Sequence, residues 1–121
     1  MSNGARSAMS WPVLVLCVVL LHTPARAEER MTFWNLTTST LTALTLAPAG
    51  TSGFGANQCA NDRDGAVEHD ERLKLTGVMP GRYDVQLTTK QGRMCIVHGV
   101  ELKAGGKYAF SLADSDLAEC H

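Results

Sequence analysis

The chain has 121 residues, a length that fits one domain. Its 11 Lys and Arg residues are balanced by 12 Asp and Glu residues, which gives a formal net charge of −1 at pH 7. This balance excludes proteins that bind nucleic acid or an anionic membrane through an extended basic surface.

Residues 1–27 have the three parts of a secretory signal peptide. A polar segment with Arg6 is followed by the apolar run WPVLVLCVVLL, and the segment ends on the small-residue site Ala25-Arg26-Ala27. The apolar run has 11 residues, too few for a helix to cross a hydrocarbon core of roughly 30 Å. We therefore predict cleavage after Ala27, export to the periplasm or the extracellular space, and no stable membrane insertion of the processed chain.

Residues 28–121 are predicted to form a single domain made of strands. Two segments rich in threonine and in aromatic or aliphatic residues, 32–37 and 41–47, are predicted strands with imperfect alternation. Four later segments alternate between apolar and polar residues, which is typical of strands with one buried and one solvated face. The residues of these segments that are predicted to face the core are Leu73, Leu75, Tyr83, Val85, Leu87, Val100, Leu102, Tyr108, Phe110 and Leu112.

The connections between these segments carry turn residues. Pro80-Gly81 suits the central positions of a type II turn, because proline fixes φ and glycine accepts a positive φ. Lys90-Gln91-Gly92 and Ala104-Gly105-Gly106 are typical of short hairpin connections. The sequence therefore predicts an all-β fold, a small antiparallel β-sandwich of about seven strands after the signal peptide.

Residues 48–70 interrupt this pattern. The segment begins with glycine and proline residues and continues into a polar, acidic run, so we predict a long loop. Long loops within compact domains are usually functional or disordered.

Phe33 and Trp34 are neighbours on one predicted strand, so their side chains point to opposite faces. We expect one of them in the core and the other exposed or covered by the long loop. An exposed aromatic side chain on the sandwich could form a contact site.

Four short motifs follow one another along the chain. They are Asn35-Leu36-Thr37, Pro48-Ala49-Gly50, the Pro-Gly-x-Tyr-Asp segment from Pro80 to Asp84, and the Gly-Val-x-Leu segment from Gly99 to Leu102. Together they resemble a loosely defined group of small exported bacterial β-sandwich proteins of unknown function. The resemblance implies the same fold and export, and it implies no site residues. The cysteines depart from the pattern of the group, because they do not flank the Tyr-Asp strand.

The acidic part of the long loop partly matches the template of a calcium-binding loop. Asp62, Asp64 and Glu71 fall at its third, fifth and twelfth positions, where acidic side chains direct oxygen atoms at one centre. Gly65 falls at the sixth position, where glycine permits a sharp bend. Ala60 at the first position removes a ligand. The candidate metal ligands are Asp62, Asp64, Glu68 and Glu71, and the other interpretation is a solvated acidic loop.

Cys59, Cys95 and Cys120 remain after cleavage, and an exported protein meets an oxidising compartment. Three cysteines allow one disulfide, in three possible pairings, and leave one thiol. We favour Cys95–Cys120, because this bridge would fix a C-terminal tail that otherwise frays.

The cysteine, histidine and methionine residues also suit a copper or zinc site. The candidate ligands are Cys59, His69, Met94, Cys95, His98, Cys120 and His121. On a strand, Cys95 and His98 point to opposite faces and cannot chelate one ion together. We therefore rank a soft-metal site below calcium and expect no other cofactor.

No motif in residues 28–121 indicates catalysis. No serine stands in a nucleophile elbow, Gly53-Phe54-Gly55 is too short for a phosphate loop, and Cys95 and His98 face apart. We predict a secreted or periplasmic, non-catalytic protein that binds an unknown protein or small ligand, or serves as an accessory structural module, and binds no nucleic acid. The alternative is an exported metal-binding protein with calcium in the acidic loop.

Overall fold

The computed structural model describes residues 30–121, and the predicted signal peptide lies outside the described residues. The strands are β1 (Met31–Leu36), β2 (Leu41–Pro48), β3 (Arg72–Leu75), β4 (Gly81–Thr89), β5 (Met94–Leu102), β6 (Phe110–Ala113) and β7 (Glu119–Cys120). Two 3-10 helices lie between them, η1 (Gln58–Asn61) and η2 (Asp114–Asp116). No helix in this part of the chain is long and apolar enough to cross a membrane.

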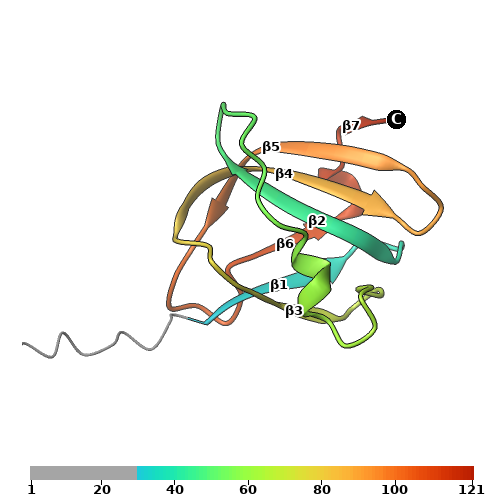
Figure 1. Ribbon diagram of the computed structural model, residues 1–121, viewed down its shortest axis with the longest axis horizontal. Helices are drawn as coiled ribbons and strands as arrows, with labels where there is room; N and C mark the ends of the chain where they lie inside the picture. The colour runs from blue at the N-terminus through green and yellow to red at the C-terminus, as the bar shows by residue number, and fades with distance from the viewer. Residues whose placement is uncertain (1–29) are drawn as a thin grey trace, which may run out of the picture.

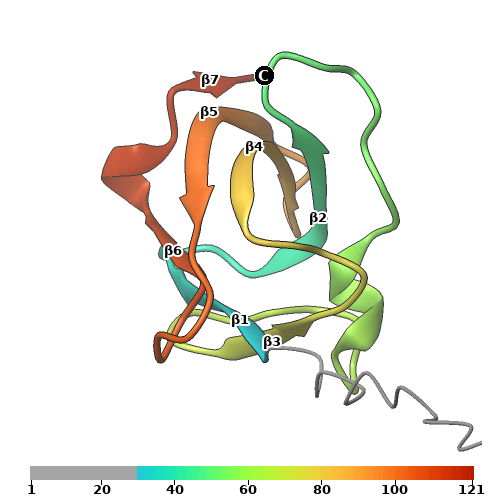
Figure 2. The ribbon, with the colours of Figure 1, turned by 90° about the vertical axis from the view of Figure 1, so that its left-hand side faces the viewer.

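The strands form two layers (Figure 1). One sheet has the order β3-β1-β6 and the other β2-β4-β5-β7, and Figure 2 shows the two sheets packed face to face. The predicted all-β sandwich is confirmed. One pairing differs from the antiparallel prediction, because β6 pairs with β1 in parallel. The preceding strand, β5, lies in the other sheet, so the chain enters β6 from across the sandwich and not through a hairpin.

The core lies between the two sheets and consists largely of the alternate residues that the period of two predicts. Phe33 of β1 and Phe110 of β6 pack with their ring centroids 4.8 Å apart. The opposite sheet contributes Leu44, Val85 and Leu87, which are fully buried. Burial of one such side chain contributes about 1.5–3 kcal/mol, so the apolar side chains between the two sheets are the main source of stability.

Two bulges break the period of two. In β2 the pairing with β4 shifts between Leu41 and Ala43, which explains the imperfect alternation of this strand. A second shift lies opposite Asp84, where β5 advances from Val97 to Val100 against two steps of β4, so the extra residue is in β5. Alternation places Asp84 on the solvated face, whereas only 6 % of it is exposed. Its carboxylate accepts hydrogen bonds from the N–H groups of Gly50 and Gly99, each at 3.0 Å, and these bonds make its burial possible.

In the last predicted segment, 107–112, the strand begins further along the sequence than predicted. Alternation places Tyr108 in the core and Ala109 on the solvated face, and the structure has the reverse, with Ala109 only 5 % exposed. The Ala109 N–H donates to the Thr32 carbonyl at 2.8 Å. Because β6 begins only at Phe110, Tyr108 precedes the regular strand and does not follow its alternation.

The connection from β2 to β3 contains η1 and passes along the edge of β2 (Figure 2). Asn57 takes the place of a neighbouring strand there: its side chain accepts the Leu44 N–H at 2.9 Å and donates to the Thr42 carbonyl at 3.1 Å. Further along, Cys59 and Val67 are fully buried in the core. The connection is therefore a fixed part of the domain, and it protects a sheet edge from pairing with another chain.

Candidate binding site

The outer face of the three-stranded sheet carries an aromatic pair. Strand alternation turns Phe33 into the core, where it is fully buried, and turns Trp34 outward, where it is partly exposed. This outcome confirms the expectation that only one of the two neighbours is in the core. Tyr108 stacks on Trp34, with ring centroids 4.8 Å apart and an angle of 28° between the ring planes.

Arg72 contacts both rings. Its guanidinium carbon lies 4.8 Å from the Trp34 ring centroid and 5.8 Å from the Tyr108 ring centroid, within the range of cation–π attraction. Its Nε donates to the Tyr108 hydroxyl at 3.2 Å. This hydrogen bond is the main cause of a lowered pKa at Tyr108 and a raised pKa at Arg72. The contact exists because β3 pairs with β1 and places Arg72 directly opposite Trp34.

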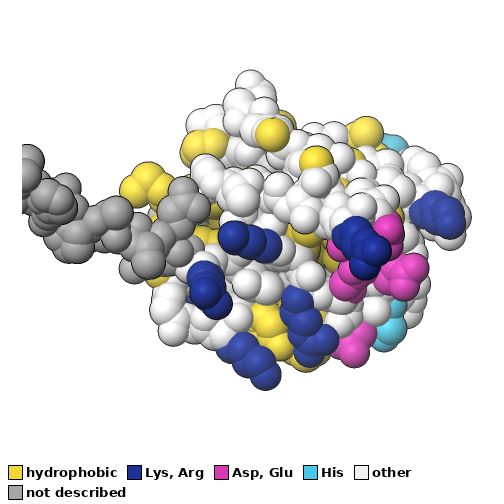
Figure 3. Space-filling view, turned by 60° about the horizontal axis from the view of Figure 1, so that its bottom comes forward, with side chains coloured by type: hydrophobic (Ala, Val, Ile, Leu, Met, Phe, Trp, Pro, Cys, Tyr) yellow, Lys and Arg dark blue, Asp and Glu magenta, His cyan; other side chains and the backbone are white. Residues whose placement is uncertain are grey.

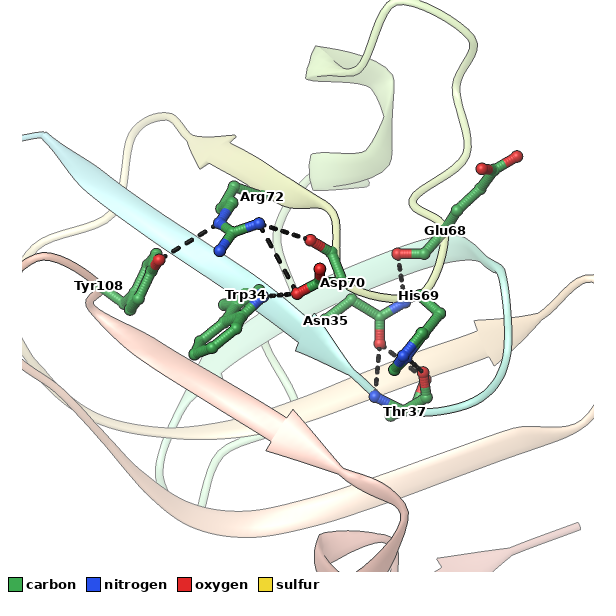
Figure 4. A network of polar contacts seen from close by, with 8 residues as sticks. All are labelled: Trp34, Asn35, Thr37, Glu68, His69, Asp70, Arg72 and Tyr108. Carbon is green, nitrogen blue, oxygen red and sulfur yellow. Dashed lines mark hydrogen bonds and ion pairs between the residues drawn. The ribbon is translucent and has the colours of Figure 1, made fainter.

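Asp70 holds the other side of Trp34 (Figure 4). Its carboxylate accepts the Trp34 indole N–H at 2.9 Å and lies 3.7 Å from the Arg72 guanidinium. Asp70 has a φ of 68°, a left-handed conformation that aspartate tolerates better than most residues. We call Trp34, Asp70, Arg72 and Tyr108 the aromatic–arginine cluster. Its side chains hold one another in position, so the surface is ordered before a ligand arrives.

Asn35 fixes the loop that carries the aspartate of the cluster (Figure 4). Its fully buried side-chain amide donates to the carbonyls of Ser39, Val67 and Glu68 at 3.0, 3.0 and 3.1 Å. Its oxygen accepts the backbone N–H of Thr37 at 3.0 Å and the Thr37 hydroxyl at 2.6 Å. One side chain therefore joins β1 to the end of the β2–β3 connection.

Basic side chains surround the aromatic–arginine cluster. Lys74 follows Arg72 on the outward face of β3, and the Lys107 ammonium lies 5.6 Å from the Tyr108 ring centroid. Within residues 30–121, neither lysine lies within ion-pair distance of a carboxylate. Figure 3 shows this side of the molecule, with Lys and Arg side chains around an apolar area. The face combines aromatic surface with positive charge, on a chain whose net charge is −1.

The structure brings together two of the four acidic residues predicted as metal ligands. Asp62 and Glu71 interact through their carboxyl groups. Asp62 also accepts the Asp64 N–H at 2.8 Å, and Glu71 accepts the Glu68 N–H at 2.7 Å. The bond from Asp64 lowers the pKa of Asp62. The bond from Glu68 lowers the pKa of Glu71, but desolvation and the neighbouring Asp62 outweigh it and raise this pKa.

No three His, Cys, Asp or Glu side chains are placed to hold a metal ion within the described part of the chain. The carboxylates of Asp64 and Glu68 do not complete a site around the Asp62–Glu71 pair. Calcium in this loop therefore stays a prediction, and at most two of the four predicted carboxylates come together.

Cys95 and Cys120 form a disulfide that joins β5 to β7, which confirms the favoured pairing. Cys59 is the free cysteine of the described residues, and it is fully buried. Burial, with the charges of Asp62 and Glu71, raises the pKa of its thiol to about 11. The raised pKa and the burial disfavour the thiolate, as is typical of a structural cysteine.

His98 contacts two carboxylates and no cysteine. Its Nε2 lies 3.0 Å from Glu119, and its Nδ1 lies 3.3 Å from the buried carboxylate of Asp84. These contacts, Glu119 first, raise the pKa of His98. The pKa of Asp84 is lowered, mainly by its two bonds from glycine N–H groups and then by His98. Because Cys95 is bonded to Cys120, it cannot bind a metal ion, and a Cys-x-x-His site for copper or zinc would lack its cysteine ligand.

A groove of about 570 Å³ lies between the β2–β3 connection and the turn before β4. Met79, 74 % exposed, and Tyr83 belong to its wall, and the Tyr83 hydroxyl donates to the Met79 carbonyl at 2.8 Å. No charged side chain lines the groove. It is a weaker candidate than the aromatic–arginine cluster, whose charges can select and orient a ligand.

The sequence patterns identify one member of the cluster and miss its partners. Trp34 is singled out by its place beside Phe33, but alternation assigns Tyr108 to the core. Arg72 and Asp70 have no distinctive local pattern, because their role depends on the pairing of β3 with β1. The outward position of Arg72, next to the inward Leu73, is the one signal that could have suggested it.

Comparison with known proteins adds no functional residue. No protein-family model matches the chain, and no curated protein or solved structure is similar enough to be matched to it. A functional assignment therefore rests on the geometry of the described residues.

Proposed function

We propose that the protein is an exported, non-catalytic binding protein whose ligand site is the aromatic–arginine cluster. Export is supported by the signal-peptide pattern of residues 1–27 and by the Cys95–Cys120 disulfide, since disulfides persist in oxidising compartments. The observation that carries the site is Trp34, a large aromatic side chain held outside the core between Asp70 and Tyr108.

The cluster has features that the packing of the sandwich does not require. Trp34 and Tyr108 place two rings on an outward sheet face, among charged side chains. Asp70 adopts a left-handed backbone conformation, and residues in rare conformations gather at functional sites. Trp, Tyr and Arg are also the residues that dominate the binding energy of protein interfaces. Together these features support a rigid recognition surface.

Binding fits the chemistry of the cluster better than catalysis. Arg72 stays protonated at every physiological pH, so it can attract an anion but cannot act as a base. Asp70 and the Tyr108 hydroxyl are both engaged by neighbours within the cluster. The cluster contains no histidine, serine or thiol, and its two groups that could transfer a proton, Asp70 and Tyr108, are bonded to Trp34 and Arg72.

Trp34 gives a direct test, because it is the only tryptophan after residue 27. The exported protein is titrated with a panel of neutral, anionic and cationic oligosaccharides and short peptides. We expect a ligand from this panel to shift the Trp34 indole resonance and to change the tryptophan fluorescence. Trp34→Phe is expected to weaken binding of that ligand, whereas Met79→Ala, in the groove, is expected to leave it unchanged. A ligand that shifts resonances around Met79 and leaves Trp34 unchanged would place the site elsewhere and overturn the proposal.

A further inference from the structure

We infer that the ligand of the aromatic–arginine cluster is an anionic saccharide, a short pyranose chain whose units carry carboxylates. The inference rests on the proposed function and names the ligand class of that same site. It is carried by the combination of ordered aromatic surface with unpaired positive charge on one sheet face.

The two rings provide a surface for a sugar ring. Aromatic faces are rich in electron density, and the C–H bonds on one side of a pyranose ring pack against such faces. The indole of Trp34 is held by its bond to Asp70 at 2.9 Å and by its stack with Tyr108. Because these rings are already ordered, they lose little conformational freedom when a ligand binds.

The cations provide partners for carboxylates. Arg72 uses its Nε and one terminal nitrogen on Tyr108 and Asp70, which leaves the other terminal nitrogen for a ligand. Lys74 and Lys107 lie on opposite sides of β1, in β3 and just before β6. The strands β3 and β6 are two strand spacings apart, about 10 Å, which is comparable to the size of a short oligosaccharide.

Two other anionic partners fit this face less well. A nucleic acid held by its backbone makes roughly six or more phosphate contacts. The cations that lie against the two rings are Arg72 and Lys107, and Asp70 lies 3.7 Å from the first of them. Basic membrane-binding segments contain about four to eight Lys or Arg residues, and insertion needs protruding apolar side chains. Trp34 is stacked and its N–H is bonded, so it does not protrude in this way.

Asp70 allows a test in which a substitution within the site is expected to tighten binding. It is the carboxylate of the cluster, so it competes with an anionic ligand for Arg72. Asparagine keeps an acceptor for the indole N–H and tolerates the left-handed backbone, but it removes the charge. An anionic ligand should therefore bind Asp70→Asn more tightly than the wild-type protein, and a neutral ligand should not distinguish the two.

The experiment compares two ligands that differ in charge, an oligogalacturonate and the neutral oligogalactoside of the same length. Binding to the exported protein is followed by Trp34 fluorescence and calorimetry at low and high salt. We expect the oligogalacturonate to bind about tenfold more tightly or better, the effect of one charge-assisted hydrogen bond. High salt should reduce this advantage, because the cations are exposed to solvent.

Four surface variants locate the effect. Lys74→Gln and Lys107→Gln are each expected to weaken oligogalacturonate binding several-fold, and Asp70→Asn to tighten it. Lys90→Gln is the matched control, since Lys90 is an exposed lysine between β4 and β5, away from the cluster. Thermal melting establishes that all four variants fold.

Three results would contradict the proposals, and they can be told apart. Equal binding of both sugars at Trp34, or equal effects of the variants and the control, overturns the anionic ligand and leaves the binding site in place. Tighter binding of a single-stranded oligonucleotide, or of phosphatidylglycerol vesicles, than of oligogalacturonate also overturns the ligand class. Oligogalacturonate binding that leaves Trp34 unchanged overturns the proposed function itself.

Discussion

Asn35 is the residue on which the position of the candidate site depends most directly. A side-chain amide can donate and accept hydrogen bonds at the same time, and Asn35 uses both capacities while fully buried. The Thr37 hydroxyl satisfies part of this demand from two residues along the chain. Through these hydrogen bonds, the Asn-x-Thr motif of the sequence joins the end of β1 to the loop before β3.

We expect Asn35→Ala to lower the free energy of unfolding by about 3 kcal/mol or more. Each buried group that loses its partner costs about 1–3 kcal/mol, and Asn35 serves several. Urea unfolding followed by circular dichroism measures the change. Asn61→Ala is the control, since Asn61 makes comparable amide contacts, to Lys74 and Thr76, at an exposed position where water can replace them. Equal losses for the two variants would contradict the role assigned to burial.

His98 makes the stability depend on pH. Its pKa is raised above the usual 6.5, so its contribution is fully present below that pH and is lost as the pH rises through the raised value. The pKa of Asp84 is lowered below 3.8, so its contribution is lost only as the pH falls through the lowered value. Both contributions therefore act together between about pH 4 and pH 6.5.

The stability advantage of the wild-type protein over His98→Gln should accordingly be larger at about pH 5.5 than at about pH 8. Urea unfolding of both proteins at the two pH values measures it. Glu119→Gln, which removes the first of the two partners, should reduce the same pH dependence. A difference between wild type and His98→Gln that does not change with pH would show that the ion pairs do not form.

Among the elements, β7 depends most on a covalent bond. It has two residues, Glu119 and Cys120, and only one neighbour, β5. The backbone of His121 extends this pairing by bonding to Met94 in both directions, at 2.8 and 3.1 Å. So short a strand at a sheet edge would fray without the Cys95–Cys120 disulfide.

We expect reduction of the disulfide to lower the free energy of unfolding by about 3 kcal/mol, since the bridged cysteines are 25 residues apart. Comparing oxidised and reduced protein avoids any change of side chain. Hydrogen exchange should show that protection is lost first at β7, while the amides of β1 and β4 stay protected. Cys59→Ser is the control for the thiol reagent and should respond to reduction as the wild type does. Full protection of β7 in the reduced protein would contradict this role of the bridge.

The strands also show which parts of an element a sequence can predict. Alternation identifies β3 and β4 because their inward residues recur every second position. It cannot identify a bulge, because the extra residue changes the phase without changing the composition. The bulge in β2 disturbs the alternation of that strand for this reason. Asp84 keeps its outward place in the alternation of β4, and its burial follows from its bonds to Gly50 and Gly99, which no local pattern marks. Tyr108 is misplaced because nothing in its neighbourhood marks the start of β6.

For the whole molecule, the sequence predicts the class of fold and not the site. The period of two requires buried faces, and two facing sheets are the simplest way to bury them. The aromatic–arginine cluster instead depends on which strands become neighbours. Trp34 and Asp70, like Arg72 and Tyr108, are 36 residues apart, and they meet only because the order of the sheet is β3-β1-β6. Local patterns contain no information on that order.

The response of the whole domain to calcium tests the acidic loop. A ligand that binds only the folded state raises stability by RT ln(1 + [L]/Kd), about 2.7 kcal/mol at a hundredfold excess over Kd, or a rise of roughly 10 °C or more in melting temperature. The structure pairs only Asp62 with Glu71, and Ala60 supplies no ligand, so we expect no shift in melting temperature between chelator and about 1 mM calcium. Glu71→Gln should be equally insensitive to calcium. A rise of several degrees that Glu71→Gln abolishes would establish a working calcium site. The acidic loop would then replace the aromatic–arginine cluster as the first candidate for the binding site of this protein.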